Sequence, residues 1–255
     1  MSTTYPPSWF PTLGAEESGA LLARVLDRAR AHPDAVVAFD LDSTLLDNRP
    51  RQARILREYG AMHGLTPLAD HEADHWQGWD ARVAMTHSGL AADLIDAHLA
   101  PFRVFWRDKF FTSEYCTDDR PISGAPTYVA DVLATGARVF YVTGRHEEMR
   151  AGTIACFERT GFPAPDGRTV ELIMKPTLEE HDDVYKARSY ASLRARGLVV
   201  AAFDNEPAHI NGYRAAFPDA ISVHLATDHS MRDIPLARGV PSIRDFAARA
   251  PASRP

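Results

Sequence analysis

A short apolar run followed by two aspartates constrains the fold of this chain more than any other stretch. Residues 36–39, VVAF, have no helical period and are short enough for a strand buried on both faces. Asp40 follows directly, and Asp42 stands two residues further on. Residues i and i+2 of an extended chain point the same way, so we expect the two carboxylates to converge. Two like charges at the end of a buried strand are unfavourable unless a cation lies between them, and a hard divalent cation suits oxygen ligands.

Strand-like runs alternate with helical patterns in the second half of the chain. The strand-like runs are at 138–142, 170–174, 198–203 and 221–225, and the helical patterns between and before them are at 16–32, 124–135, 146–160 and 182–196. This alternation predicts an α/β fold built on a doubly wound parallel sheet. Ligands of such sheets bind outside the carboxyl ends of the strands. We therefore expect the polar segments that follow the strands to meet in one place.

Residues 48–120 differ from the rest because they contain helical patterns but no strand-like run. They predict a mostly helical insertion, while 15–47 and 121–255 form the α/β core. The insertion is rich in aromatic residues, which are Trp76, Trp79, Phe102, Phe105, Trp106, Phe110 and Phe111. We interpret these rings as the small core of the insertion rather than as a platform for nucleic-acid bases.

Charge and composition limit the classes of partner. The net charge of −6 and the lack of a long basic run make nucleic acid an unlikely partner. No apolar run approaches the roughly 20 residues that cross a bilayer, and the N-terminus has no secretory pattern. Cys116 and Cys156 form no CxxC pair, as expected for reduced thiols. These features predict a cytoplasmic protein without a membrane partner. They carry no information about the oligomeric state.

The residue types at the strand ends are those of a phosphate site. The residues expected to assemble there are Asp40, Asp42, Thr143, Gly144, Arg145, Asp204 and a lysine. Carboxylates that hold a divalent cation, together with Lys and Arg, bind phosphate groups. We also expect Thr143 and Gly144 to open a helix, so that backbone N–H groups and the helix dipole face an anion.

Four ordered segments make the interpretation specific. DLDST at 40–44, VTGR at 142–145, a downstream lysine and FDNEP at 203–207 resemble the motifs of the haloacid dehalogenase superfamily, phosphatase branch. The resemblance covers the α/β core, and the insertion at 48–120 is similar in position to the C1-type helical caps of that superfamily. It implies a HAD-like Rossmannoid core with a helical cap.

The resemblance also implies roles for the residues. Asp40 would attack phosphorus and form an aspartyl-phosphate, and Asp42 would act as general acid and then general base. Mg²⁺ would be bound by the carboxylates of Asp40 and Asp204 and by the backbone carbonyl of Asp42. The substrate-binding residues would be Thr143, Gly144, Arg145 and Lys175. An acid at position 42 favours phosphate esters over alkyl halides, because an alkoxide leaving group needs a proton.

Two lysines compete for the catalytic position. Lys186 ends the segment HDDVYK, which resembles an Asp-Asp-Val-x-Lys stretch in the phosphatase half of polynucleotide kinase–phosphatases. Lys175 directly follows a strand, and we favour Lys186 over it. The motifs depart from the common pattern at Ser43, where glycine is usual, and at Asn205, where a second aspartate is frequent.

The favoured function is a Mg²⁺-dependent phosphomonoester hydrolase that acts on a small-molecule phosphate ester. The alternatives are a polynucleotide 3′-phosphatase-like enzyme, a phosphotransferase or phosphomutase, and a catalytically inactive sensor of a phosphorylated ligand. The identity of the leaving group is not encoded in the motifs, because the residues that would contact it lie in the insertion.

Overall fold

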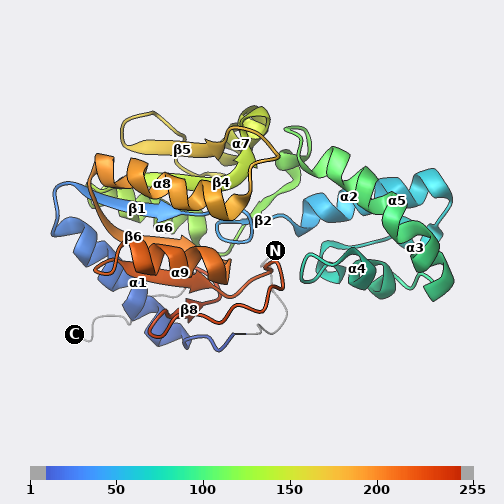
Figure 1. Cartoon of the computed structure of the whole chain (residues 1–255), viewed down its shortest axis with the longest axis horizontal. Helices are drawn as coiled ribbons and strands as arrows, with labels where there is room; N and C mark the ends of the chain where they lie inside the picture. The colour runs from blue at the N-terminus through green and yellow to red at the C-terminus, as the bar shows by residue number, and fades with distance from the viewer. Residues whose placement is uncertain (1–9, 248–255) are drawn as a thin grey trace.

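Six parallel strands form the central sheet of this protein. The computed structural model describes residues 10–247. The strands lie in the order β5-β4-β1-β6-β7-β8 (Figure 1). Their bounds are β1 (Ala35–Phe39), β4 (Arg138–His146), β5 (Val170–Lys175), β6 (Leu198–Asp204), β7 (Ile221–Leu225) and β8 (Ser242–Ile243). Every neighbouring pair in this sheet is parallel. The predicted α/β class is confirmed.

The sheet is covered by helices on both faces, which confirms the doubly wound arrangement. Val37 and Phe39 of β1 belong to the hydrophobic cluster on one face, whereas Val36 and Ala38 belong to the cluster on the other. The first cluster includes side chains of α1 (Ala15–Arg30), α6 (Ala125–Ala134) and α7 (Arg150–Thr160). The second includes side chains of α8 (Asp182–Arg196) and α9 (Pro207–Ala216). Burial on both faces explains why β1 is apolar throughout.

Helices between β2 and β3 form a separate body beside the sheet (Figure 1). They are α2 (Arg49–His63), α3 (Thr66–Ala69), η1 (Ala73–His75), α4 (Ala81–His87), α5 (Ala92–Phe110) and η2 (Tyr115–Asp118). They have a hydrophobic cluster of their own, in which Leu56, Trp76 and Phe102 are completely or almost completely buried. Neither α5 nor any other helix in residues 10–247 is long and apolar enough to cross a membrane.

Two short strands join this helical body to the sheet. β2 (Leu46–Asp47) pairs antiparallel with β3 (Arg120–Pro121), with Leu46 opposite Pro121. The pairing is extended by a hydrogen bond from the N–H of Ile122 to the carbonyl of Leu45 at 2.9 Å. The two chain segments that enter and leave the helical body therefore run side by side.

One local expectation is wrong. The backbone at Thr143 and Gly144 does not open a helix, because β4 continues to His146 and pairs with β5 up to Lys175. A single 3₁₀ turn, η3 (Glu147–Met149), follows before α7 begins at Arg150. The N-terminus of a long helix therefore does not face the residues of the second motif.

Candidate active site

A lysine joins two buried aspartates at the carboxyl ends of neighbouring strands. Asp40 follows β1, Asp204 ends β6, and Lys186 lies in the second turn of α8. The Nζ atom of Lys186 donates to Oδ1 of Asp40 at 2.6 Å and to Oδ2 of Asp204 at 2.9 Å. It also donates to the carbonyl of Val142 at 2.7 Å. Asp40 is 6% exposed, Lys186 2% and Asp204 0%, so bulk water hardly competes for these contacts.

The charge of this group is not fully balanced. The pKa of Asp40 is raised to about 7, because burial, helped by the neighbouring Asp204, outweighs the opposing effect of Lys186. Burial also disfavours ionised Asp204, but Lys186 and His209 outweigh it and hold its pKa below the usual range. One ammonium group therefore lies between two carboxylates, of which Asp204 is held in its ionised form and Asp40 is not.

The donor set at this point fits a hard divalent cation. Oδ2 of Asp40 accepts a hydrogen bond from the Thr44 hydroxyl at 3.1 Å, and Oδ1 of Asp204 accepts one from the N–H of Glu206 at 2.9 Å. These bonds fix the orientation of both carboxylates. No group of three His, Cys, Asp or Glu side chains in residues 10–247 is arranged as a metal site. Mg²⁺ commonly uses one or two carboxylates together with carbonyl, phosphate and water oxygens, so the set suits Mg²⁺.

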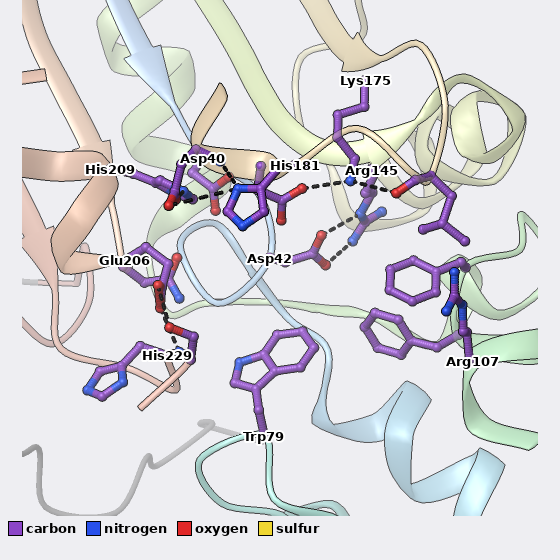
Figure 2. A pocket seen from close by; sticks show the side chains of 18 of the residues that line it. Asp40, Asp42, Trp79, Arg107, Arg145, Lys175, His181, Glu206, His209 and His229 are labelled. Atoms are coloured by element: carbon purple, nitrogen blue, oxygen red, sulfur yellow. Dashed lines mark hydrogen bonds and ion pairs between the residues drawn. The ribbon is translucent and has the colours of Figure 1, made fainter. Parts of the chain in front are cut away.

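The carboxylate of Asp42 points toward arginines rather than toward Asp40. Arg145 donates to it from Nε at 2.9 Å and from Nη2 at 2.7 Å, as Figure 2 shows. Arg51 and Asn48 donate to its Oδ1 at 3.2 and 3.3 Å. Burial disfavours ionised Asp42, but these partners, Arg145 foremost, hold its pKa well below the usual range. Arg145 is 2% exposed and is bound to carboxylates here.

A second buried aspartate extends this contact into the helical body. Asp119 accepts from Nη2 of Arg145 at 2.5 Å and from Nε of Arg51 at 2.9 Å. The guanidinium carbon of Arg51 lies 4.3 Å from the ring centroid of Phe110. We call Asp42, Arg51, Asp119 and Arg145 the junction cluster, because they join α2, the start of β3 and the end of β4. Sequence reasoning missed Arg51 and Asp119, and no motif spacing marks them.

The other residues of the second motif and Lys175 have different surroundings. Thr143 is fully buried, its Oγ1 accepts the N–H of Arg145 at 3.2 Å, and it is not among the described residues that line the cavity. Gly144 lines the cavity, and a Cβ there would lie 3.0 Å from Oδ2 of Asp182. Lys175 donates to Asp182 at 2.7 Å and to the carbonyls of Glu180 and Leu178. It therefore holds the loop at 176–181, while Lys186 contacts Asp40.

The residues after Asp204 connect the site to a loop near its mouth. Asn205 accepts from the Thr44 hydroxyl at 3.1 Å and donates to the carbonyl of Asp228 at 2.6 Å. Glu206 accepts from the N–H of Ser230 at 2.6 Å. Asn205 thus ties the first and fourth motifs together, and Glu206 anchors the loop that contains Ser230.

A cavity of about 880 Å³ lies between these residues and the helical body. Asp40 and Asp42 of the core line it, and so do Trp79, Trp106 and Phe110 of the helical body. Figure 2 shows Trp79 opposite Asp42. Its volume is much larger than a phosphate group and lies within the range of about 300–1,000 Å³ that is usual for small-molecule sites.

The parallel sheet brings the first, second and fourth motifs to the carboxyl ends of its strands, the arrangement expected from their resemblance to haloacid dehalogenase motifs. No protein-family model matches the chain. A curated relative is N-acetylmuramic acid 6-phosphate phosphatase of Pseudomonas aeruginosa, which is 31% identical over 101 residues, 39% of this chain and 43% of that protein. The match thus spans less than half of the length of this relative.

Solved structures with a related chain trace have low sequence identity. One is Protein Tyrosine Kinase A of Mycobacterium tuberculosis, with a TM-score of 0.48 and 19% identity over 82% of this chain and 92% of that chain. Another is a haloacid dehalogenase-like family protein of Streptococcus pneumoniae, with a TM-score of 0.43 and 10% identity over 76% of this chain and 87% of that chain.

Proposed function

We propose that this protein is a Mg²⁺-dependent phosphomonoester hydrolase that acts on a small phosphorylated substrate through an aspartyl-phosphate on Asp40. The contact of Lys186 with both Asp40 and Asp204, on the wall of a cavity of substrate size, carries the proposal. The partial match to a phosphatase supports the same reaction class.

The first step is an attack by a carboxylate oxygen of Asp40 on phosphorus, with cleavage of the bond to the leaving oxygen. Lys186 is held by the Val142 carbonyl and faces the negative charge that develops on the transferred group. A magnesium ion held by Asp40, the Asp42 carbonyl and Asp204 would neutralise charge on the phosphate oxygens. The raised pKa of Asp40 fits a site completed by such a cation.

Asp42 supplies the proton in this scheme. It donates a proton to the leaving oxygen and then takes one from the water that hydrolyses the aspartyl-phosphate. Arg145 and Arg51 stabilise its ionised form, so the side chain has to turn away from them and take up a proton from solvent before it can donate one. The partial exposure of Asp42, 20% of its side chain, leaves it access to the cavity.

The remaining site residues position the substrate or its ligands. The N–H of Gly144 is the proposed contact for a phosphoryl oxygen, because Gly144 lines the cavity. Thr143 and Arg145 act beside it, where Thr143 fixes the backbone and Arg145 holds Asp42. Lys175 shapes the loop at 176–181.

Residues 48–120 act in this proposal as a cap, with 15–47 and 121–255 as the catalytic core. The separate hydrophobic cluster and the paired strands β2 and β3 support this division. A cap that closes the cavity would exclude bulk water and contact the leaving group.

The test is phosphate release from a panel of esters with Mg²⁺. Asp40→Asn should abolish turnover. Lys186→Ala should lower kcat by at least about 10²–10³-fold, the loss seen when one donor to the developing charge is removed. Lys175→Ala is the matched control and should keep most activity, since its contacts hold a loop. Equal and mild losses in both lysine variants would reject the assignment. Phosphate binding without turnover of any ester would indicate a sensor instead.

A further inference from the structure

Trp79 packs on the hydrophobic cluster of the helical body but is not fully buried in it. Trp76, by contrast, is 1% exposed and belongs to the hydrophobic cluster there. Trp79 is partly exposed and lines the cavity. Figure 2 shows its indole across the cavity from Asp42, with His229 to one side. The ring therefore faces the space next to the reacting carboxylates.

The backbone of Trp79 is held in an unfavourable conformation. Its φ is +58°, in the left-handed region, which for a bulky residue costs on the order of 1–3 kcal/mol and persists only where surrounding contacts impose it. Contacts of the residues on both sides of Trp79 impose this conformation. The N–H of Gly78 donates to Oδ1 of Asp228 in the core at 3.0 Å, and Asp80 caps α4 by accepting from the N–H of Arg82 at 2.8 Å.

Two rings of the helical body contact Trp79 in T-shaped arrangements. Phe110 lies 5.5 Å away with an angle of 75° between the ring planes, and Trp106 lies 6.4 Å away with an angle of 88°. Trp106 itself stacks on Phe110 at 4.4 Å. Within residues 10–247 no aromatic ring stacks on the indole of Trp79. The described aromatic residues therefore provide no stacked partner for the indole of Trp79.

The cavity has room for a flat ligand beyond the phosphate group. The cavity has a volume of about 880 Å³ and is lined by the carboxylates of the core and by the aromatic rings of the helical body. A leaving group bound to phosphorus at Asp40 would extend toward Trp79. Stacking of a ring on an aromatic side chain strengthens binding enough to select among esters.

We propose that Trp79 is the platform that binds the leaving group, and that the substrate is a phosphate ester whose alcohol carries a ring with a flat face. This inference rests on the proposed function, because it names the substrate class of the same cavity. The shared chemistry is an apolar ring face next to a phosphorylated hydroxyl group. Nucleotides present it through the base, and hexose phosphates through the pyranose ring.

The experiment compares three kinds of ester that differ in the alcohol: nucleoside 5′-monophosphates, hexose 6-phosphates and the acyclic glycerol 3-phosphate. Trp79→Leu should lower kcat/KM by about 10-fold or more for the ring class that the site prefers, mainly through KM. Glycerol 3-phosphate should change by less than about twofold. The ring class whose kcat/KM falls most in Trp79→Leu identifies whether the flat face belongs to a base or to a pyranose ring.

Phe105→Leu is the matched control, because Phe105 is a partly buried aromatic residue of the same helical body that packs on its cluster. It should leave the preference for ring esters unchanged. If Trp79→Leu lowers kcat/KM equally for ring and acyclic esters, or for neither ring class, Trp79 does not bind the leaving group.

Calorimetric binding in the Asp40→Asn background separates this inference from the proposed hydrolysis. There the preferred ring ester should bind about 10-fold more tightly than glycerol 3-phosphate, and Trp79→Leu should remove the difference. If the protein binds ring esters preferentially but the wild type turns over none of them, the proposed hydrolysis is wrong and the role of Trp79 stands. If the wild type turns over esters without a preference for rings, the role of Trp79 is wrong and the proposed hydrolysis stands.

Discussion

Ser43 shows strain at the level of a single residue in the first motif. Its φ is +58°, it is completely buried, and among the described residues its hydroxyl has no hydrogen-bond partner. Glycine adopts this conformation without a Cβ penalty of about 1–2 kcal/mol. Ser43→Gly should therefore raise the free energy of unfolding by about 1 kcal/mol, measured by urea denaturation.

Ser222 offers the matched comparison for Ser43. It is also buried with an unpartnered hydroxyl in the described part of the chain, but it lies in the regular strand β7. Ser222→Gly should destabilise the protein, by about 0.5–1 kcal/mol, because glycine weakens a strand interior. A loss of stability in both variants would show that φ at Ser43 is not a source of strain.

Asp228 makes stability depend on pH. Its Oδ1 accepts the Gly78 N–H, its Oδ2 has no partner in residues 10–247, and burial raises its pKa to about 6. A carboxyl with a raised pKa in the folded state holds its proton more tightly there, so stability falls as pH rises from about 4 to 6. At pH 8 the raised pKa lowers the free energy of unfolding by about 3 kcal/mol, since each pKa unit corresponds to 1.36 kcal/mol.

Asp228→Asn should therefore stabilise the protein at pH 8, since asparagine keeps an acceptor for Gly78 but carries no charge. The advantage should disappear below pH 4, where the wild-type carboxyl is protonated in both states. Urea denaturation at the two pH values measures it, with the exposed Asp219→Asn as control. An equal difference in stability at both pH values would contradict this account.

At the level of elements, the junction cluster is where the helical body is tied to the sheet. Asp119 is completely buried between Arg51 and Arg145. Asp119→Asn leaves two buried guanidinium groups with Asp42 as their remaining carboxylate. Removal of one member of a buried ion pair costs about 3–5 kcal/mol, and we expect a loss of that size in the free energy of unfolding.

The neighbouring residue provides the control for Asp119. Asp118 pairs with Arg54 at 3.0 Å, but the two side chains are about one-third exposed. Asp118→Asn should cost less than about 1 kcal/mol, as is usual for exposed ion pairs. Similar losses for the two variants would mean that burial of the junction cluster does not determine its energy.

The core strands could be predicted from the sequence because they are buried on both faces and therefore apolar throughout. The strands β2, β3 and β8 were missed, because strands of two residues carry no periodic pattern and depend on distant partners. The end of β4 was placed too early. Its polar residues 143–146 continue as a strand because β5 supplies hydrogen-bond partners, which no local pattern reveals.

The same distinction applies to the candidate site. The carboxyl-end rule correctly indicated that residues after β1 and β6 lie near each other, since Asp40 and Asp204 contact one ammonium group. The sequence favoured Lys186 over Lys175, but the contact of Lys186 with Asp40 is visible only in three dimensions, because Lys186 lies in α8 while Lys175 ends β5. The binding of Arg145 to Asp42 and Asp119, and the position of Trp79, also depend on residues far apart in the chain.

At the level of the whole molecule, the cavity lies between two bodies that have separate hydrophobic clusters. The bodies are joined by β2 and β3, by the junction cluster, and by the hydrogen bond from Gly78 to Asp228. Ligands that bind the cavity wall at Asp40 and Asp204 therefore act on the core directly.

Binding of Mg²⁺ should consequently stabilise the folded protein through the core carboxylates. A ligand present at 100 times its Kd adds about 2.7 kcal/mol, so saturating Mg²⁺ should raise the Tm and EDTA should reverse the rise. Asp204→Asn should abolish this shift because it removes one of the two carboxylates that contact Lys186. Asp183→Asn is the control, since Asp183 lines the same cavity but pairs with His209 and Arg232. A wild-type Tm that does not respond to Mg²⁺, or a full response in Asp204→Asn, would exclude a magnesium site between Asp40 and Asp204.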